Sequence, residues 1–236
     1  MQAWLLVVAM LVSVVTGIGT TKTAKAATKM GVTYTVHVQT YGDQQGWVHD
    51  GTMAGTKGQA KRLEEIRVKL TGDEYSGSIQ YKTHIQSYGW QDWSYNGEKS
   101  GSRGQAKRLE GIEIQLTGEV AKHYDVVYRV NCKTYVWMDW MKNGVMAGTS
   151  GQAKRLEAIR ISLYGEMAEH YDIYYRVHAQ SFGWLSWAKN GEASGTAGLA
   201  KRLEGIQIIL VPKGSPEPGR TYDNITATNT VSFIRR

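Results

Sequence analysis

The sequence predicts an all-β protein built from four tandem β-repeats of about 46 residues, with short antiparallel strands and hairpins. The motif Gly-Gln-Ala-Lys-Arg-Leu-Glu begins at residues 58, 104 and 151, and again at 198 with Leu199 replacing Gln. Each copy lies between two segments in which apolar and polar residues alternate, which is the period of a half-buried strand. An Asn-Gly or Asp-Gly pair, typical of tight hairpin turns, precedes each motif. We assign the repeats to residues 34–72, 81–118, 128–165 and 175–211.

The segments outside the repeats predict export and a flexible end. Residues 1–26 contain a short apolar run followed by Ala24-Lys25-Ala26, which is typical of a cleavable signal peptide, although no Lys or Arg precedes the run. We therefore expect a secreted, extracellular protein that is associated with the cell surface and keeps no stable membrane span after cleavage. Residues 27–33 form a short lead. Residues 212–236 carry all three prolines, so we expect a linker and tail, with the folded part ending near residue 211.

Composition excludes several function classes. The net charge is +7, but the basic residues recur mostly as one Lys-Arg pair per repeat with acids nearby, so the sequence gives no sign of a nucleic-acid partner. The single cysteine, Cys132, excludes an intrachain disulfide and falls in the apolar register of a strand, where we expect a small buried hydrophobe. We expect no metal and no cofactor, because no His/Cys cluster has metal-ligand spacing.

Each repeat opens with a predicted strand that has one buried face. Its apolar members are Tyr34, Val36 and Val38 in the first repeat, with equivalents beginning at Tyr81, Tyr128 and Tyr175. The opposite face carries a histidine in three repeats and Asn131 in the other. An asparagine cannot replace an imidazole as a base, so these histidines predict surface or groove positions rather than a site of chemistry.

A tryptophan segment follows this strand. The pairs Trp90/Trp93, Trp137/Trp140 and Trp184/Trp187 are three residues apart, so an extended strand would point them to opposite faces; the first repeat keeps only Trp47. We expect the second tryptophan to be core and the first to be an exposed platform for a sugar or another flat apolar group, with Asp92 and Asp139 supplying hydrogen bonds. The alternative is that both tryptophans are buried between repeats, because units this small need bulky core residues.

The seven-residue motif connects the hairpin to the last strand. Its leucine lies three residues before the first isoleucine of that strand. In a flat strand, residues an odd number of positions apart point to opposite faces, so the leucine would leave the core. We therefore expect a bulge or single helical turn at Glu65, Gly111, Ala158 and Gly205. An arginine and a glutamate two residues apart share one face. We expect this pair to pin the bend or to bridge to the next repeat; the alternative is a recognition cluster for anionic or hydroxylated ligands. The four pairs are Arg62/Glu64, Arg108/Glu110, Arg155/Glu157 and Arg202/Glu204.

These elements together resemble the clostridial hydrophobic repeat with a characteristic tryptophan, the ChW repeat. The resemblance lies in Tyr-x-Val-His-x-Gln, Gly-Trp-x-x-Trp, Asn-Gly and Ala-Gly-Thr-x-Gly-Gln-Ala-Lys-Arg-Leu-Glu-x-Ile-x-Ile-x-Leu, and the first repeat departs from it at the first tryptophan. It implies a secreted or cell-surface protein of a Gram-positive bacterium, with repeats that serve adhesion or ligand binding. It supplies no agreed set of ligand residues.

We therefore expect a non-catalytic, multivalent binding or adhesion module whose partner is a polysaccharide or cell-wall polymer. The alternatives are a purely structural or protein–protein adhesion repeat that binds a surface protein, and an accessory region of a secreted glycoside hydrolase. We expect no catalytic residues: the adjacent carboxylates Glu64 and Glu65 occur in one repeat only, and no nucleophile signature is present. The sheets are expected to pack as a prism or barrel, or as beads that pair.

Overall fold

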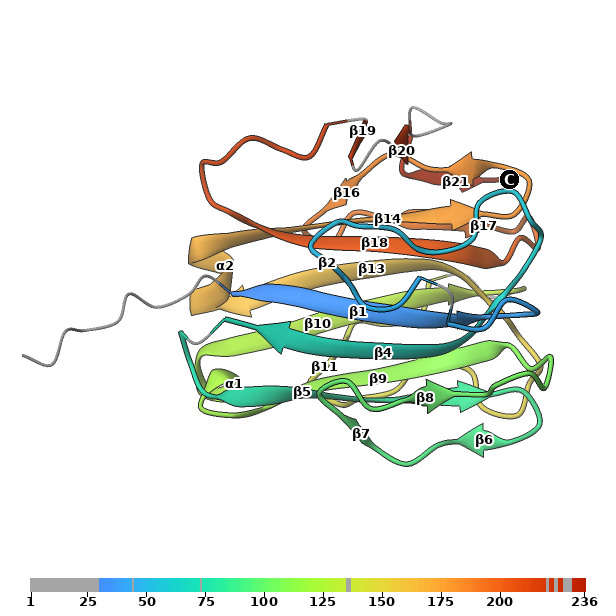
Figure 1. Cartoon of the computed structure of the whole chain (residues 1–236), viewed down its shortest axis with the longest axis horizontal. Coiled ribbons are helices and arrows are strands. Elements are labelled where there is room, and N and C mark those ends of the chain that lie inside the picture. Colours follow the sequence, from blue (N-terminus) through green and yellow to red (C-terminus); the bar gives the residue numbers. More distant parts are fainter. Residues whose placement is uncertain are drawn as a thin grey trace, which may run out of the picture.

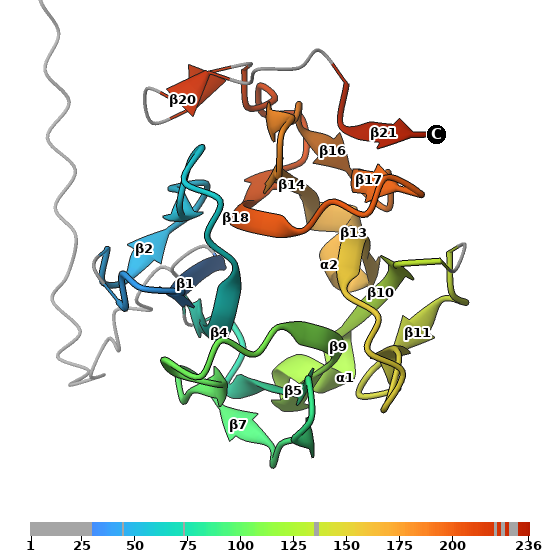
Figure 2. The same ribbon diagram turned by 90° about the vertical axis from the view of Figure 1, so that its right-hand side faces the viewer.

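The computed structural model describes residues 30–43, 45–72, 74–134, 137–219, 221–222, 225–226 and 231–236. Four small sheets stand around a common axis as a four-bladed, propeller-like ring (Figures 1 and 2). The prediction of four tandem all-β repeats is confirmed, and the ring is the arrangement they adopt. The expected signal peptide lies outside the described residues. No helix among the described residues is long and apolar enough to cross a membrane.

Two long antiparallel strands from one repeat form the centre of each blade. The four pairs are β1 (Gly31–Val38) with β4 (Leu63–Thr71), β5 (Gly77–Ile85) with β9 (Leu109–Gly118), β10 (Tyr124–Cys132) with β13 (Leu156–Gly165), and β14 (Tyr171–Ala179) with β18 (Leu203–Pro212). Short strands of the tryptophan segment pair with the first long strand of their own repeat. They are β2 (Val48–His49), β6 (Gly89–Trp90), β7 (Ser94–Tyr95), β11 (Met141–Lys142), β15 (Gly183–Trp184) and β16 (Ala188–Lys189).

A further short strand joins each blade to its neighbour. After the Asn-Gly turn, the chain does not fold back as the return arm of a local hairpin, which is what the sequence suggested; it crosses to the sheet of the preceding repeat. β8 (Ser100–Gly101) pairs with β4, β12 (Ala147–Gly148) with β9, and β17 (Ser194–Ala197) with β13. β3 (Ala54–Gly55) of the first repeat pairs with β18 of the fourth, which closes the ring.

The turn itself has the predicted chemistry. Asn96 and Gly97 both have positive φ, 29° and 105°, and the Glu98 amide donates to the Tyr95 carbonyl over 2.8 Å. Two consecutive positive φ values define the type I′ turn that Asn-Gly favours. The same pairs of positive φ values occur at residues 50–51, 143–144 and 190–191.

A tyrosine hydroxyl on each blade forms hydrogen bonds to the blade before it. The Tyr81 hydroxyl accepts the Val68 amide over 2.8 Å and donates to the Glu98 carbonyl, and the Tyr34 hydroxyl accepts the Ile208 amide over 3.0 Å across the closing seam. Tyr128 and Tyr175 repeat the contact with Ile114 and Ile161. These four tyrosine side chains are fully buried. The tyrosine that begins the alternating strand of each repeat therefore supplies both core packing and a hydrogen-bonded link between blades.

We expect these tyrosines to make the ring sensitive to alkali. Burial raises the pKa of Tyr81 and of Tyr128 to about 12, against about 10 in an unfolded chain. A raised pKa favours the neutral phenol in the folded state, so this contribution to stability is intact below pH ~10 and is lost as the pH rises toward ~12. Each tyrosine accounts for a loss of about 2–3 kcal/mol in the free energy of unfolding over this pH range. Urea unfolding at several pH values between 9 and 12 measures the loss, and Tyr81→Phe should flatten part of the pH dependence. A stability that is constant from pH 9 to 12 would contradict the assignment.

The bulge expected within the motif is present but lies one residue earlier than predicted. His37 pairs with Glu65 and Val38 with Leu63, so Glu64 is the extra residue. The other three repeats shift register at the same place, which makes Glu110, Glu157 and Glu204 the bulged residues. The shift restores the leucine to the apolar face and turns the glutamate inward, where its side chain is buried.

The apolar faces of the second long strands meet on the axis. They enclose an apolar cavity of about 120 Å³. Its walls include Val68, Ile114, Ile161 and Ile208, one from each repeat. One end of the ring is covered by the short helices α1 (Val120–His123) and α2 (Glu166–His170), which bury Val120 and Met167.

The chain beyond residue 211 is part of the fold, so the prediction that folding ends there is wrong. β19 (Thr221–Tyr222) pairs with β20 (Ile225–Thr226), and β21 (Phe233–Arg235) adds in parallel to β17 at the outer edge of blade 3 (Figure 2). Ile234 packs into the cluster of Val177 and Leu185. A proline-rich linker is followed here by a short segment that returns to the sheet.

Candidate ligand-binding surface

The first tryptophan of each pair packs against its own blade. The Trp90 ring lies edge-on to His84 with centroids 5.4 Å apart, and its atoms come within 3.1 Å of where a Cβ on Gly111 would be. Trp184 repeats this with His178 and Gly205 and is fully buried, so the expectation that it is an exposed platform is wrong. Trp90 and Trp137 are half-buried.

The second tryptophan lies at the seam between two blades. Trp47 contacts Gly97 of the next repeat's turn, and Trp93 and Trp140 contact Gly144 and Gly191 in the same way. Yet the side chains of Trp47 and Trp140 are 40% and 42% exposed. The expectation of a core residue is therefore wrong for these two, while Trp93 and Trp187 are half-buried.

A cation lies over both tryptophans in three repeats. Lys82 Nζ is 5.3 Å from the Trp90 centroid and 4.9 Å from that of Trp93. Arg129 and Arg176 take the same place beside Trp137/Trp140 and Trp184/Trp187. These cation–π contacts stabilise the stack. The adjacent Asp92 and Asp139 are exposed on the surface.

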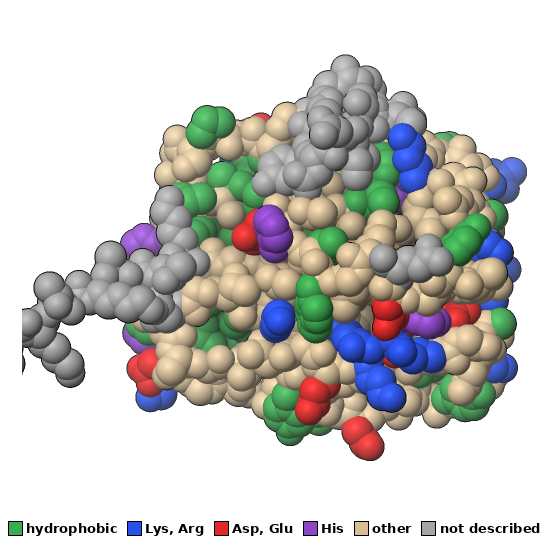
Figure 3. Space-filling view, viewed as in Figure 1, with side chains coloured by type: hydrophobic (Ala, Val, Ile, Leu, Met, Phe, Trp, Pro, Cys, Tyr) green, Lys and Arg blue, Asp and Glu red, His purple; other side chains and the backbone are tan. Residues whose placement is uncertain are grey.

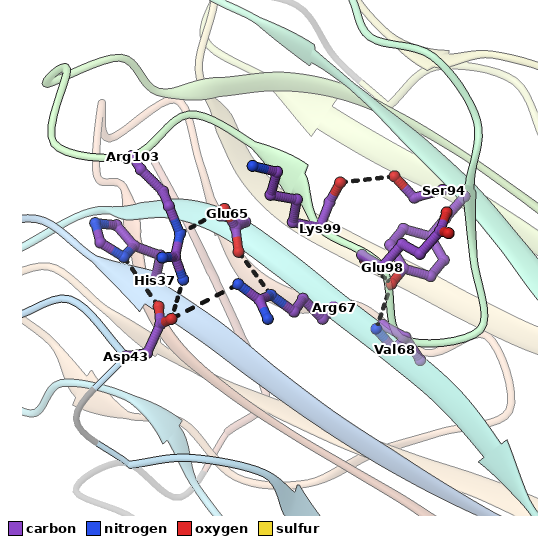
Figure 4. A network of polar contacts seen from close by, with 10 residues as sticks. His37, Asp43, Glu65, Arg67, Val68, Ser94, Glu98, Lys99 and Arg103 are labelled. Atoms are coloured by element: carbon purple, nitrogen blue, oxygen red, sulfur yellow. Dashed lines mark hydrogen bonds and ion pairs between the residues drawn. The ribbon is translucent and has the colours of Figure 1, made fainter.

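The first repeat replaces its missing tryptophan with charges. The inserted Asp43 bonds the His37 ring nitrogen over 3.0 Å and pairs with Arg103, while Glu65 bonds Arg67 over 2.8 Å and Arg103 over 3.0 Å (Figure 4). Glu65 occupies the position at which the other repeats have Gly or Ala under the indole. Basic side chains lie beside acidic and histidine side chains over this face of β1 and β4 in Figure 3. The adjacent carboxylates Glu64 and Glu65 thus have separate ion-pair partners, Arg62 and Arg67.

The motif arginines and glutamates meet in all four repeats. The shortest nitrogen–oxygen distances are 3.2 Å for Arg62/Glu64, 3.0 Å for Arg108/Glu110, 3.8 Å for Arg155/Glu157 and 2.9 Å for Arg202/Glu204. Arg108 also donates to the Ala153 carbonyl of the next repeat over 2.7 Å, and Arg202 donates to Ala60 across the closing seam over 2.5 Å. The arginines, with the adjacent leucines, line an axial pocket of about 140 Å³.

Burial of these carboxylates has an electrostatic consequence. Desolvation raises the pKa of Glu157, partly offset by Arg155. Desolvation also lowers the pKa of His84, against the attraction of Glu110, whose carboxylate lies 3.5 Å away.

Among the residues that the structure describes, no group of three or more His, Cys, Asp or Glu side chains is arranged to hold a metal ion.

Grooves with an exposed tyrosine lie at the rim of blades 1 and 2. On blade 2, a groove of about 430 Å³ is lined by Tyr88, Gln91, Lys99, Arg103 and Gln105, among others. The Tyr88 side chain is 54% exposed. Lys107, from the motif, lies 5.7 Å from the Tyr88 ring and donates to Ser87.

The equivalent groove on blade 1 has about 260 Å³ and is lined by Tyr41, Gln45, Lys57 and Gln59. Tyr41 is 37% exposed, and Lys61 lies 5.7 Å from its ring and donates to Thr40 over 3.1 Å. Sequence reasoning missed these tyrosines. The available signal was an aromatic residue seven positions after the first strand tyrosine in every repeat: Tyr41, Tyr88, Tyr135 and Phe182.

The sequence pattern of the ChW family, clostridial hydrophobic W, matches residues 37–72, 84–118, 137–165 and 178–212, which is more than half of the chain. The protein belongs to the ChW family. Each matched segment contains the second long strand of one blade, while the first long strand lies wholly or mostly before the match. A search of curated proteins and a search of solved structures each gave no match.

The ChW residues fall into two groups by position. The tryptophans, the turn Asn-Gly and the Arg-Leu-Glu part of the motif lie at joints within and between blades. The motif glutamine and lysine lie at the rim beside an exposed tyrosine. The rim grooves are therefore the arrangement best suited to contact a ligand in this ChW protein.

Proposed function

We propose that this protein is a secreted, cell-surface, non-catalytic module that binds a polysaccharide or cell-wall polymer through several equivalent rim sites. The observation that carries the proposal is the repetition of one groove on blades 1 and 2. In each, an exposed tyrosine lies beside two glutamines and basic side chains. An aromatic ring supplies a flat apolar face for a pyranose ring, and amides and ammonium groups supply donors and acceptors for its hydroxyls.

Repetition would convert weak sites into strong attachment. A second site on the same rigid ring binds the same polymer chain at a high effective concentration, so avidity exceeds the affinity of one groove by orders of magnitude. The ring fixes the spacing between the grooves, because each blade is hydrogen-bonded to the next. A long repeating polymer suits this geometry better than a small soluble sugar.

The test is retention on insoluble polysaccharides and purified cell walls. We expect the wild-type protein to be retained by at least one of these polymers. We expect Tyr41→Ala with Tyr88→Ala to lower its affinity about tenfold or more, because each groove loses its stacking face. Tyr164→Ala is the matched control, since Tyr164 is 55% exposed at the far end of β13 and lies outside both grooves.

Three outcomes would count against the proposal. Equal retention of the double variant and the wild type would remove the rim grooves from the site. Failure of the wild type to bind any polymer in the panel would favour the alternative, an adhesion module that binds a surface protein. Release of reducing sugar from a bound polymer would contradict the non-catalytic part of the proposal.

A further inference from the structure

Blade 3 holds two arginines directly opposite each other. Arg129 on β10 and Arg160 on β13 are partners across the antiparallel pair. Their guanidinium carbons lie 5.3 Å and 4.6 Å from the Trp137 ring centroid. Like charges at directly opposed positions destabilise a sheet, and flanking by indoles reduces the screening by water. The repulsion between the two guanidinium groups therefore destabilises the blade unless a negative charge offsets it.

In the other three blades, the basic side chain at this position has an acidic or neutral partner. In blade 2, Lys82 faces Glu113 and forms a 2.9 Å ion pair. In blade 4, Arg176 faces the neutral Gln207 and donates to its side-chain oxygen over 2.5 Å.

In blade 1, the residue opposite Arg67 is the neutral Thr35, and Arg67 bonds the carboxylate of Glu65. Blade 3 is thus the exception among four copies of one site.

Neither guanidinium of blade 3 finds a carboxylate in the described part of the chain. The Nε atoms of both Arg129 and Arg160 are buried without a hydrogen-bond partner, and Arg160 has one long contact of 3.4 Å to the Gly191 carbonyl. Burial, and then the charge of Arg129, lower the pKa of Arg160. Trp137 is held in place by Phe233 of the returning tail, with centroids 5.6 Å apart. The pair is therefore fixed in position with unused donors.

We propose that Arg129 and Arg160 form an oxyanion-binding site on blade 3, which takes a carboxylate or phosphate group beside Trp137. Two planar guanidiniums offer paired donors that match the oxygens of such a group, and the anion removes the repulsion between them. The group would come from an acidic sugar or from a phosphate-bearing polymer. The site is independent of the rim grooves and stands whether or not they bind glycans.

The test is thermal unfolding in inorganic phosphate, glycerol phosphate or galacturonate, each compared with chloride at the same ionic strength. A ligand that binds only the folded state raises Tm. We expect at least one of these anions to raise the Tm of the wild type, and the more effective class identifies the group that the site takes. Arg160→Gln copies blade 4, so the variant should fold. We expect it to lose the anion-dependent shift while keeping, or exceeding, the wild-type Tm in chloride.

Two further variants sharpen the result. Lys142→Gln removes one exposed charge from the neighbouring β11 and should keep the full shift. Arg160→Lys keeps the charge without the planar fork and should weaken anion binding about tenfold. The proposal is overturned if the wild type responds to none of the anions, or if Arg160→Gln responds as the wild type does. A purely structural cation–π role predicts instead that Arg160→Gln lowers Tm in chloride.

Discussion

Replacing Gly55 by alanine is expected to destabilise the ring by about 3–5 kcal/mol, because it places a methyl group inside the closing seam. Gly55 has φ of 115°, a conformation that non-glycine residues rarely adopt, and an added Cβ would lie 2.4 Å from the Glu204 carbonyl oxygen and 2.6 Å from the Gly205 Cα. Both contacts are with backbone on the partner strand, which cannot move aside without breaking the pairing of β3 with β18.

Gly58→Ala is the matched control for this prediction. Gly58 also has positive φ, 66°, but nothing lies within 4 Å of an added Cβ. This variant carries the backbone cost alone, about 1 kcal/mol. Chemical unfolding of both variants separates the steric effect from the conformational one. Equal losses of stability in the two variants would show that the closing strand is not as close to β18 as described.

Trp184→Ala is expected to cost about 3–5 kcal/mol, because a fully buried indole leaves a large cavity. The ring packs over Gly205 and against His178, so neither backbone nor side chain can readily fill the space. Removing this residue to test ligand binding would therefore confuse loss of a site with loss of the fold. Urea unfolding gives the free-energy change directly.

Trp47→Ala is the comparison for this second prediction. Trp47 is 40% exposed and contacts the neighbouring turn through one edge of its ring. Its truncation should cost distinctly less than that of Trp184. A Trp184 variant as stable as the Trp47 variant would argue that the first tryptophan is exposed after all, as the sequence suggested.

The strands, turns and bulge of each repeat were predictable from sequence because they depend on local chemistry. The alternation from Tyr34 to Val38 defines a one-faced strand, and the misplaced Leu63 requires an irregularity before Ile66. The bulge falls at Glu64 because this position lets the carboxylate turn inward to Arg62. The odd spacing between Leu63 and Ile66 shows that one residue is extra, but it does not show which one.

The tryptophan prediction failed because it assumed a continuous strand. The strand breaks between Trp90 and Trp93, so the alternation of faces does not apply and both rings approach Lys82. Ring closure was likewise beyond local reasoning. Nothing in the two-residue strand Ala54–Gly55 indicates that its partner lies in the fourth repeat.

One long-range feature did leave a trace in the sequence. The repeat without a first tryptophan is also the repeat with Glu65 in place of Gly or Ala, because that residue lies under the indole in the other blades. The two substitutions belong to one change, in which an apolar stack is exchanged for the network of Asp43, Glu65 and Arg103.

The central claim is that four repeats form one closed ring within a single chain. The most direct measurement is the methyl–methyl NOE between Ala54 and Ile206, which are Cα partners across the closing seam and share one apolar cluster. We predict a strong NOE that is intramolecular, with no cross-peak between labelled and unlabelled molecules in a mixed sample. An absent NOE, or one that appears only between molecules, would contradict the closed ring.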